Sequence, residues 1–164
     1  MKALILVISG LILTSCTFAQ SQNDSVPNEL VGKWYKGSTS ALGFLDRRTG
    51  ISDAAGGDGF SFEFKSNGTF VKAGMVKAGS YSCSTIVFGY ETGKFTATGN
   101  NLKMADKENY VSYKDSCNPH TNSEKNAKLA IKEYPYEIRD DEDGDTVLCL
   151  AYKGGEECFK KAEA

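Results

Sequence analysis

Apolar and polar side chains alternate with a period of two in several stretches of the chain beyond residue 30. The clearest case is Phe60–Lys65, where three phenylalanines alternate with Ser61, Glu63 and Lys65. In a β-strand, successive side chains point to opposite faces of the sheet, so this pattern predicts a strand with one aromatic face.

A hairpin turn is predicted directly after this strand, at Ser66-Asn67-Gly68. A two-residue turn at Asn67-Gly68 pairs Phe64 with Val71 and Phe62 with Ala73, which places apolar side chains opposite one another. We expect this register. A three-residue turn with a bulge is the alternative, and it shifts the register by one residue.

Further short strands follow at close intervals, and no segment has a convincing amphipathic helical period. Near Glu133 the alternation changes phase beside Pro135, which predicts a bulge or a sheet edge. The remaining predicted strands are Leu30–Tyr35, Gly79–Phe88, Lys94–Thr98, Leu102–Met104, Tyr110–Tyr113, Ala127–Ile138, Thr146–Tyr152 and Glu157–Lys160. Such a series predicts an all-β fold, an antiparallel meander of about eight strands that closes into a barrel and so removes its edges.

The first residues have the organisation of an export signal. Lys2 is followed by an apolar run, Ala3–Leu13, which is too short to span a bilayer. The run ends in Leu13-Thr14-Ser15-Cys16, which resembles the lipobox of bacterial lipoproteins, whose cysteine is lipidated and becomes the first residue. We therefore expect a signal peptide over 1–15, lipidated Cys16, a polar tether over 16–28 and one domain over 29–164. Cleavage after Ala19 is the alternative, and it yields a secreted protein.

The composition favours an exported β protein that does not bind nucleic acid. The chain has 17 glycines and 3 prolines, and 11% of its residues are aromatic. Its formal net charge is −2, and no run of lysine or arginine is longer than two residues. A nucleic-acid surface needs a concentration of positive charge, so we expect no such partner.

Five cysteines support export, because one belongs to the leader and four remain. Four cysteines permit three pairings, of which we expect Cys83–Cys117 and Cys149–Cys158. The second pair flanks a turn at Lys153-Gly154-Gly155 and so fits a terminal hairpin. We expect no metal ion and no cofactor, because there is no Cys-x-x-Cys motif and a single histidine.

Three motifs occur in the order found in a known family. Gly32-Lys33-Trp34 looks like the Gly-x-Trp signature of lipocalins, and 62–70 and 93–104 resemble two hairpins of lipocalin-like bacterial envelope proteins. The resemblance implies a lipocalin-like barrel in which Trp34 closes the floor. It also implies a location in the cell envelope, on the outer membrane if the anchor is present.

The candidate site follows from the barrel. We expect a small apolar ligand against the inward aromatic residues Phe60, Phe62, Phe64 and Phe95, beneath Phe44 of the loop Gly37–Gly59. An eight-stranded barrel can also be filled by its own side chains. The alternative function is then a protein-interaction module, such as a protease inhibitor or an assembly accessory, with a partner that the chain does not identify.

No catalytic constellation is evident, so we do not expect an enzyme. His120 lies in a polar stretch, and no Gly-x-Ser-x-Gly motif is present. The acidic run Asp140–Asp145 does not match the ligand spacing of a calcium loop, and a hairpin turn at Asp143-Gly144 explains it better.

Overall fold

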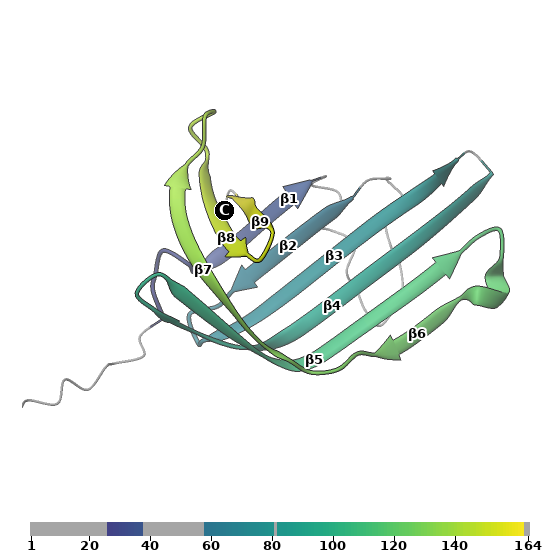
Figure 1. The fold of residues 1–164 in the computed structure, drawn as a ribbon, viewed down its shortest axis with the longest axis horizontal. Coiled ribbons are helices and arrows are strands. Elements are labelled where there is room, and N and C mark those ends of the chain that lie inside the picture. The colour runs from purple at the N-terminus through teal and green to yellow at the C-terminus, as the bar shows by residue number, and fades with distance from the viewer. Residues whose placement is uncertain (1–25, 38–57, 81, 163–164) are drawn as a thin grey trace, which may run out of the picture.

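The structure is a computed structural model that describes residues 26–37, 58–80 and 82–162. Apart from one 3₁₀ turn at Pro119–Thr121, the regular structure in these ranges is β (Figure 1). The strands are β1 (Gly32–Gly37), β2 (Gly59–Phe64), β3 (Thr69–Ser80), β4 (Cys83–Thr98), β5 (Asn101–Asp115), β6 (Ser123–Asn126), β7 (Ile131–Asp140), β8 (Thr146–Tyr152) and β9 (Gly155–Lys161).

The strands form a closed antiparallel barrel. They pair in the order β4-β3-β2-β1-β9-β8-β7-β5-β6, and β4 also pairs with β5. This second pairing closes a ring of eight strands and leaves β6 attached to β5 outside the ring. The predicted fold, a meander that closes into a lipocalin-like barrel, is confirmed.

The expected register of the first hairpin is wrong, and the three-residue alternative is correct. Phe64 pairs with Phe70, and Phe62 pairs with Lys72. A type I′ turn needs positive φ at both central residues, but no described residue other than glycine has a positive φ. Gly68 takes φ 77°, and the side chain of Asn67 accepts a 3.1 Å hydrogen bond from the Thr69 amide.

Other strand boundaries also differ from expectation, for example in β4 and β5. The segment Gly79–Phe88 is not one strand, because β3 ends at Ser80 and β4 begins at Cys83. The segments 102–104 and 110–113 belong to one strand, β5, whose register against β4 shifts between Thr92 and Gly93. Lys107 is the extra residue of this bulge and has no partner on β4. The residues of β5 that point inward are therefore even-numbered before Lys107 and odd-numbered after it, which interrupts the alternation in the sequence.

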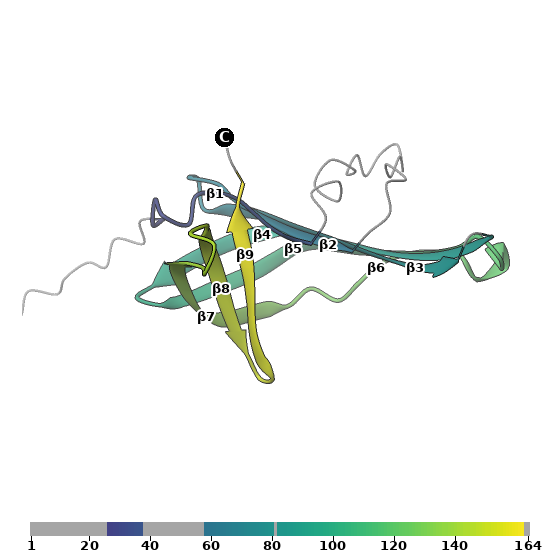
Figure 2. The ribbon, with the colours of Figure 1, turned by 90° about the horizontal axis from the view of Figure 1, so that it is seen from above.

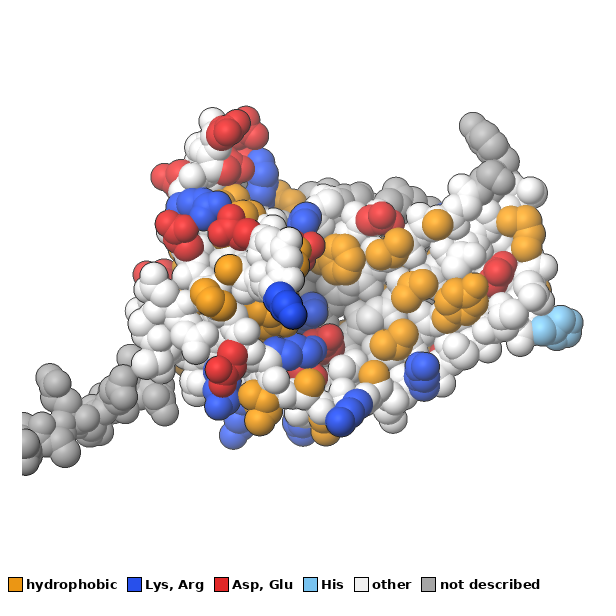
Figure 3. Space-filling view, in the orientation of Figure 1, with side chains coloured by type: hydrophobic (Ala, Val, Ile, Leu, Met, Phe, Trp, Pro, Cys, Tyr) orange, Lys and Arg blue, Asp and Glu red, His pale blue; other side chains and the backbone are white. Residues whose placement is uncertain are grey.

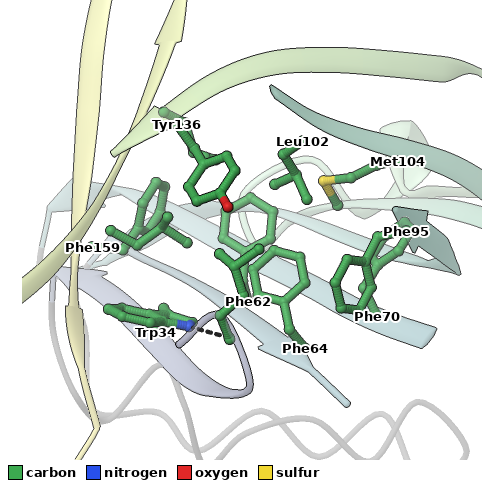
Figure 4. Packing of buried hydrophobic residues seen from close by; sticks show 12 residues of the cluster. Trp34, Phe62, Phe64, Phe70, Phe95, Leu102, Met104, Tyr136 and Phe159 are labelled. Atoms are coloured by element: carbon green, nitrogen blue, oxygen red, sulfur yellow. Dashed lines mark hydrogen bonds between the residues drawn. The ribbon is translucent and has the colours of Figure 1, made fainter. Parts of the chain in front are cut away.

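Side chains fill one end of the barrel (Figure 4). The rings of Phe62 and Phe159 meet edge to face with centroids 4.9 Å apart, and those of Phe64 and Phe95 are also 4.9 Å apart. The buried members of this core are Leu30, Trp34, Phe62, Phe64, Phe70, Phe95, Leu102, Met104, Tyr136, Leu148, Leu150 and Phe159. Val26, the first residue that the structure describes, packs against this core.

Beyond the closed ring, β3, β4 and β5 continue as an extended sheet with β6 at its edge (Figure 2). The disulfide Cys83–Cys117 joins the start of β4 to the segment after β5, with the two Cα atoms 5.2 Å apart. The disulfide Cys149–Cys158 links directly paired residues of β8 and β9. Both predicted pairings are confirmed.

Candidate functional site

An open hollow of about 220 Å³ lies on the inner face of the sheet, where β3, β4 and β5 leave the closed ring. We call it the apolar hollow. Four apolar side chains, two glycines and two charged side chains line it on this face: Phe60, Val76, Val87, Val111, Gly74, Gly89, Lys72 and Glu91. Phe88 also borders the hollow, but it pairs with Met75 and Ser112, so its side chain points to the opposite face. Figure 3 shows hydrophobic side chains gathered on this face, over the extended sheet.

The register explains why the apolar hollow continues the core. Directly paired residues of neighbouring strands share a face of the sheet. Phe62 of the core pairs with Lys72. The next pair on the same face, two residues further along each strand, is Phe60 with Gly74. The apolar hollow is therefore the next layer of the barrel interior above the aromatic floor.

Two glycines create the space. Gly74 of β3 pairs with Gly89 of β4, so neither strand sends a side chain inward at this level. The ring of Phe60 covers Gly74, since a Cβ there would come within 2.5 Å of Phe60 Cδ1. A Cβ at Gly89 would have no heavy atom within 4 Å, so Gly89 faces open space.

The apolar lining is exposed to an unusual degree for a sheet interior. Phe60, Val76 and Val87 are 37%, 38% and 40% exposed, although they lie on the face that carries the core. Contiguous apolar surface of this kind marks sites where a ligand or a partner binds.

Four charged side chains lie at the base of the apolar hollow, on β3, β4, β5 and β7. Lys72 Nζ is 3.5 Å from one oxygen of Glu91, and Lys132 Nζ is 2.5 Å from the other. Lys132 also lies 3.4 Å from Asp106, whose side chain is fully buried. We call Lys72, Glu91, Lys132 and Asp106 the charged cluster.

The charges of the cluster compensate each other. Burial lowers the pKa of Lys132, but its hydrogen bond to Glu91 and the charges of Glu91 and Asp106 outweigh burial and raise the pKa above its ordinary value. Asp106 Oδ2 accepts a 3.2 Å hydrogen bond from the Ala130 amide. Its Oδ1 has no hydrogen-bond partner among the residues that the structure describes.

The predicted site residues separate into two groups. Phe62, Phe64 and Phe95 are buried in the core, each at most 4% exposed, whereas Phe60 lines the apolar hollow. Trp34 is fully buried, as the resemblance implied. Contact of these phenylalanines with a ligand stays a prediction. Phe60 differs from the other three in being 37% exposed.

Sequence reasoning missed the rest of the site. The expected register placed Val71 and Ala73 on the inner face, whereas the structure places Phe70, Lys72, Gly74 and Val76 there. An inward lysine followed by an inward glycine was the available signal for a polar layer below an open space.

The carboxylates of the acidic turn are paired with a lysine. Carboxylate oxygens of Asp141, Asp143 and Asp145 lie within 4.8 Å of one another, but Lys160 Nζ approaches them at 3.3, 3.6 and 2.6 Å. An ammonium group therefore occupies the position that a cation would take. The Gly144 amide donates to the Asp141 carbonyl at 3.0 Å, which confirms the predicted turn.

Several predicted features lie outside the described residues. These are the signal peptide, Cys16, the tether up to residue 25, and residues 38–57 of the loop Gly37–Gly59, which include Phe44. The two ends of the loop are described and pair with each other next to Phe60. Over the described ranges, no helix has the length and apolar character needed to cross a membrane.

Comparison with protein-family models, with curated proteins and with solved structures finds no match for this chain.

Proposed function

We propose that this chain is a binding module of the cell envelope that holds a small apolar ligand in the apolar hollow of its barrel. The observation that carries the proposal is the exposed apolar lining directly above a packed floor. Ligand sites are concave and mostly apolar with a few polar groups, and the mouths of barrels are among their preferred places. The role requires no catalytic group.

The size of the apolar hollow restricts the ligand. Its volume of about 220 Å³ is below the roughly 300–1,000 Å³ of pockets for drug-sized molecules. The ligand is therefore small, or it inserts one chain or ring and leaves the rest outside. The phenylalanines below the hollow are packed against one another and leave no room for a ligand in the floor. We therefore place the ligand higher, at the level of Phe60 and Gly89.

Anchoring through Cys16 is part of the proposal. It rests on the apolar run after Lys2 and on the sequence Leu13-Thr14-Ser15-Cys16. The anchor would hold the barrel at the outer membrane. Replacing Cys16 with serine should release a soluble or uncleaved form, and a mature N-terminus at Gln20 without fatty acid would contradict this part.

A protein-interaction module is the second candidate, and the filled floor favours it. A barrel whose interior is largely packed can present its surface rather than its lumen. The exposed side chains of Val76 and Val87 would then contact a partner chain instead of a small molecule.

A fluorescence titration with a neutral apolar probe, N-phenyl-1-naphthylamine, tests the proposed function. The discriminating variant is Gly89→Leu, which fills the apolar hollow from a position with open space around it. The matched control is Thr96→Leu, which adds the same side chain to β4 at an exposed position. We expect saturable binding by the parent, a loss of about tenfold or more in Gly89→Leu, and parental binding in the control.

Two results would contradict the proposal. One is the absence of saturable binding to the parent protein. The other is parental affinity in a folded Gly89→Leu variant, which would place the probe elsewhere and leave the interaction module as the better account.

A further inference from the structure

The charged cluster lies where a ligand in the apolar hollow would end. Lys72 pairs with Phe62 in the register, and its ammonium is 5.6 Å from the centre of the Phe62 ring. Lys72 and Glu91 also line the apolar hollow. A ligand that enters from the open side therefore meets apolar walls first and charged groups at the base.

Of these two charged groups, Lys72 has the capacity to bind a further partner. Its side chain is 29% exposed, and its ion pair with Glu91 is long, at 3.5 Å. An ammonium group carries three donors, so a single long contact leaves donors to offer.

Glu91 does not have the same capacity. Lys72 faces one of its carboxylate oxygens and Lys132 is hydrogen-bonded to the other, and the side chain is 17% exposed. Lys132 lies between Glu91 and Asp106 and so is neutralised from both sides. A cationic head group would find its acceptors already engaged with lysines, whereas an anionic head group would find the Lys72 ammonium.

We infer that the ligand is a single-chain amphiphile with one anionic head group, which pairs with Lys72 while its chain packs against Phe60, Val76, Val87 and Val111. The inference rests on the proposed function and specifies the ligand class of the same site. A contact between ammonium and carboxylate in a partly buried site is stronger than a contact between neutral groups. The head group therefore determines selectivity, and the apolar walls supply affinity for the chain.

Isothermal titration calorimetry with three ligands of equal chain length tests the inference. The ligands are decanoate, decanol and decylammonium, and they are titrated into the intact purified protein. We expect decanoate to bind about tenfold more tightly than decanol, and decylammonium to bind most weakly. Raising the salt concentration should reduce the preference for decanoate, because ions screen a partly exposed pair.

Substitutions at Lys72 assign the preference to one side chain. Lys72→Met should remove the preference for decanoate and leave decanol binding near the parental value. Lys72→Arg should keep it, because the positive charge is retained. The matched control is Lys94→Met, at an exposed position of β4, which should bind all three ligands like the parent.

The outcomes separate this inference from the proposed function. Equal binding of decanol and decanoate by the parent overturns the anionic head group but leaves the apolar site intact. A preference for decanoate that persists in Lys72→Met assigns the head group to another residue and also overturns the inference. Absence of binding for all three ligands rejects the proposed function itself. If Lys72→Met does not fold, the comparison of the three ligands on the parent still decides.

Discussion

The indole nitrogen of Trp34 donates a 2.9 Å hydrogen bond to the carbonyl oxygen of Leu30, four residues earlier in the chain. Both residues are fully buried, and the bond ties the turn before β1 to the aromatic floor (Figure 4). The Leu30 amide in turn donates to the Pro27 carbonyl at 3.1 Å. The residues before the first strand thus close one end of the barrel.

Replacing Trp34 with phenylalanine should destabilise the fold without affecting the apolar hollow. The variant leaves the Leu30 carbonyl without its donor and leaves unfilled volume in the core, so we expect a loss of about 2–4 kcal/mol in the free energy of unfolding. Urea denaturation measures the loss. Unchanged stability would show that the floor does not depend on this bond, and a change in probe affinity would show that the floor and the hollow are coupled.

Two glycines of β4 should respond oppositely to alanine. A Cβ at Gly93 would lie 2.0 Å from the Ala105 carbonyl oxygen and 2.7 Å from the Phe70 ring, whereas Gly89 faces open space. Gly93→Ala should cost about 3 kcal/mol or more, because the backbone at the bulge has to move. Gly89→Ala should be neutral or add up to about 1 kcal/mol, since glycine weakens a strand interior. Chemical denaturation of both variants measures the difference, and equal stabilities would contradict the close approach at Gly93.

The register and the bulge show where sequence reasoning reached its limit. The alternation in 60–65 was sufficient to predict β2, and the turn at Lys153-Gly154-Gly155 to predict the terminal hairpin of β8 and β9. The length of β5 was not predictable in this way, because the extra residue Lys107 changes which positions face inward. The pattern of one strand then resembles that of two.

The sequence predicted only part of the candidate site, because the rest depends on strand register and on depth in the barrel. Phe60, Phe62 and Phe64 occupy the same face of β2, but their environments differ with depth in the barrel, which alternation does not encode. The pairing of Gly74 with Gly89 depends on the register between β3 and β4, two strands whose boundaries were themselves misassigned. The charged cluster gathers side chains from four strands, and closure of the ring brings them together.

The two disulfides should stabilise the protein unequally. The bridge Cys83–Cys117 closes a separation of 34 residues, and Cys149–Cys158 closes one of 9. Loss of chain entropy in the unfolded state predicts a contribution of about 3–4 kcal/mol for the first and about 2–3 kcal/mol for the second. Denaturation of the two double cysteine-to-serine variants measures each contribution. A larger loss for the terminal hairpin would contradict the entropic account.

Stability should fall in alkaline solution. The pKa of Lys132 is raised above 10.5 in the folded state by Glu91 and Asp106 despite its burial, so its contribution is complete below that pH and is lost as the pH rises further. Burial raises the pKa of the Tyr134 hydroxyl above 10.0 in the folded state. As the pH rises, the unfolded chain therefore loses this proton before the folded protein does, which also favours unfolding. Urea denaturation at about pH 8 and about pH 11 should show the decrease.

The contribution of Lys132 to this trend is separable. In Lys132→Met the alkaline decrease should be smaller than in the parent, because one of the titrating groups is gone. The variant should also be less stable at neutral pH, by about 3 kcal/mol, since Asp106 keeps a buried charge without its lysine. An alkaline decrease equal to that of the parent would show that Lys132 does not carry the effect.

The central claim is that ligand binds on the inner face above the packed floor, and mapping amide chemical shifts during a titration tests it most directly. Isotope-labelled protein is titrated with N-phenyl-1-naphthylamine, and two-dimensional NMR spectra are followed to saturation. We predict that the largest changes occur at Phe60, Gly74, Gly89 and Val111, with little change at Trp34 and Phe159 of the floor. Changes centred on the floor, or confined to exposed positions away from the apolar hollow such as Tyr152, would contradict the account.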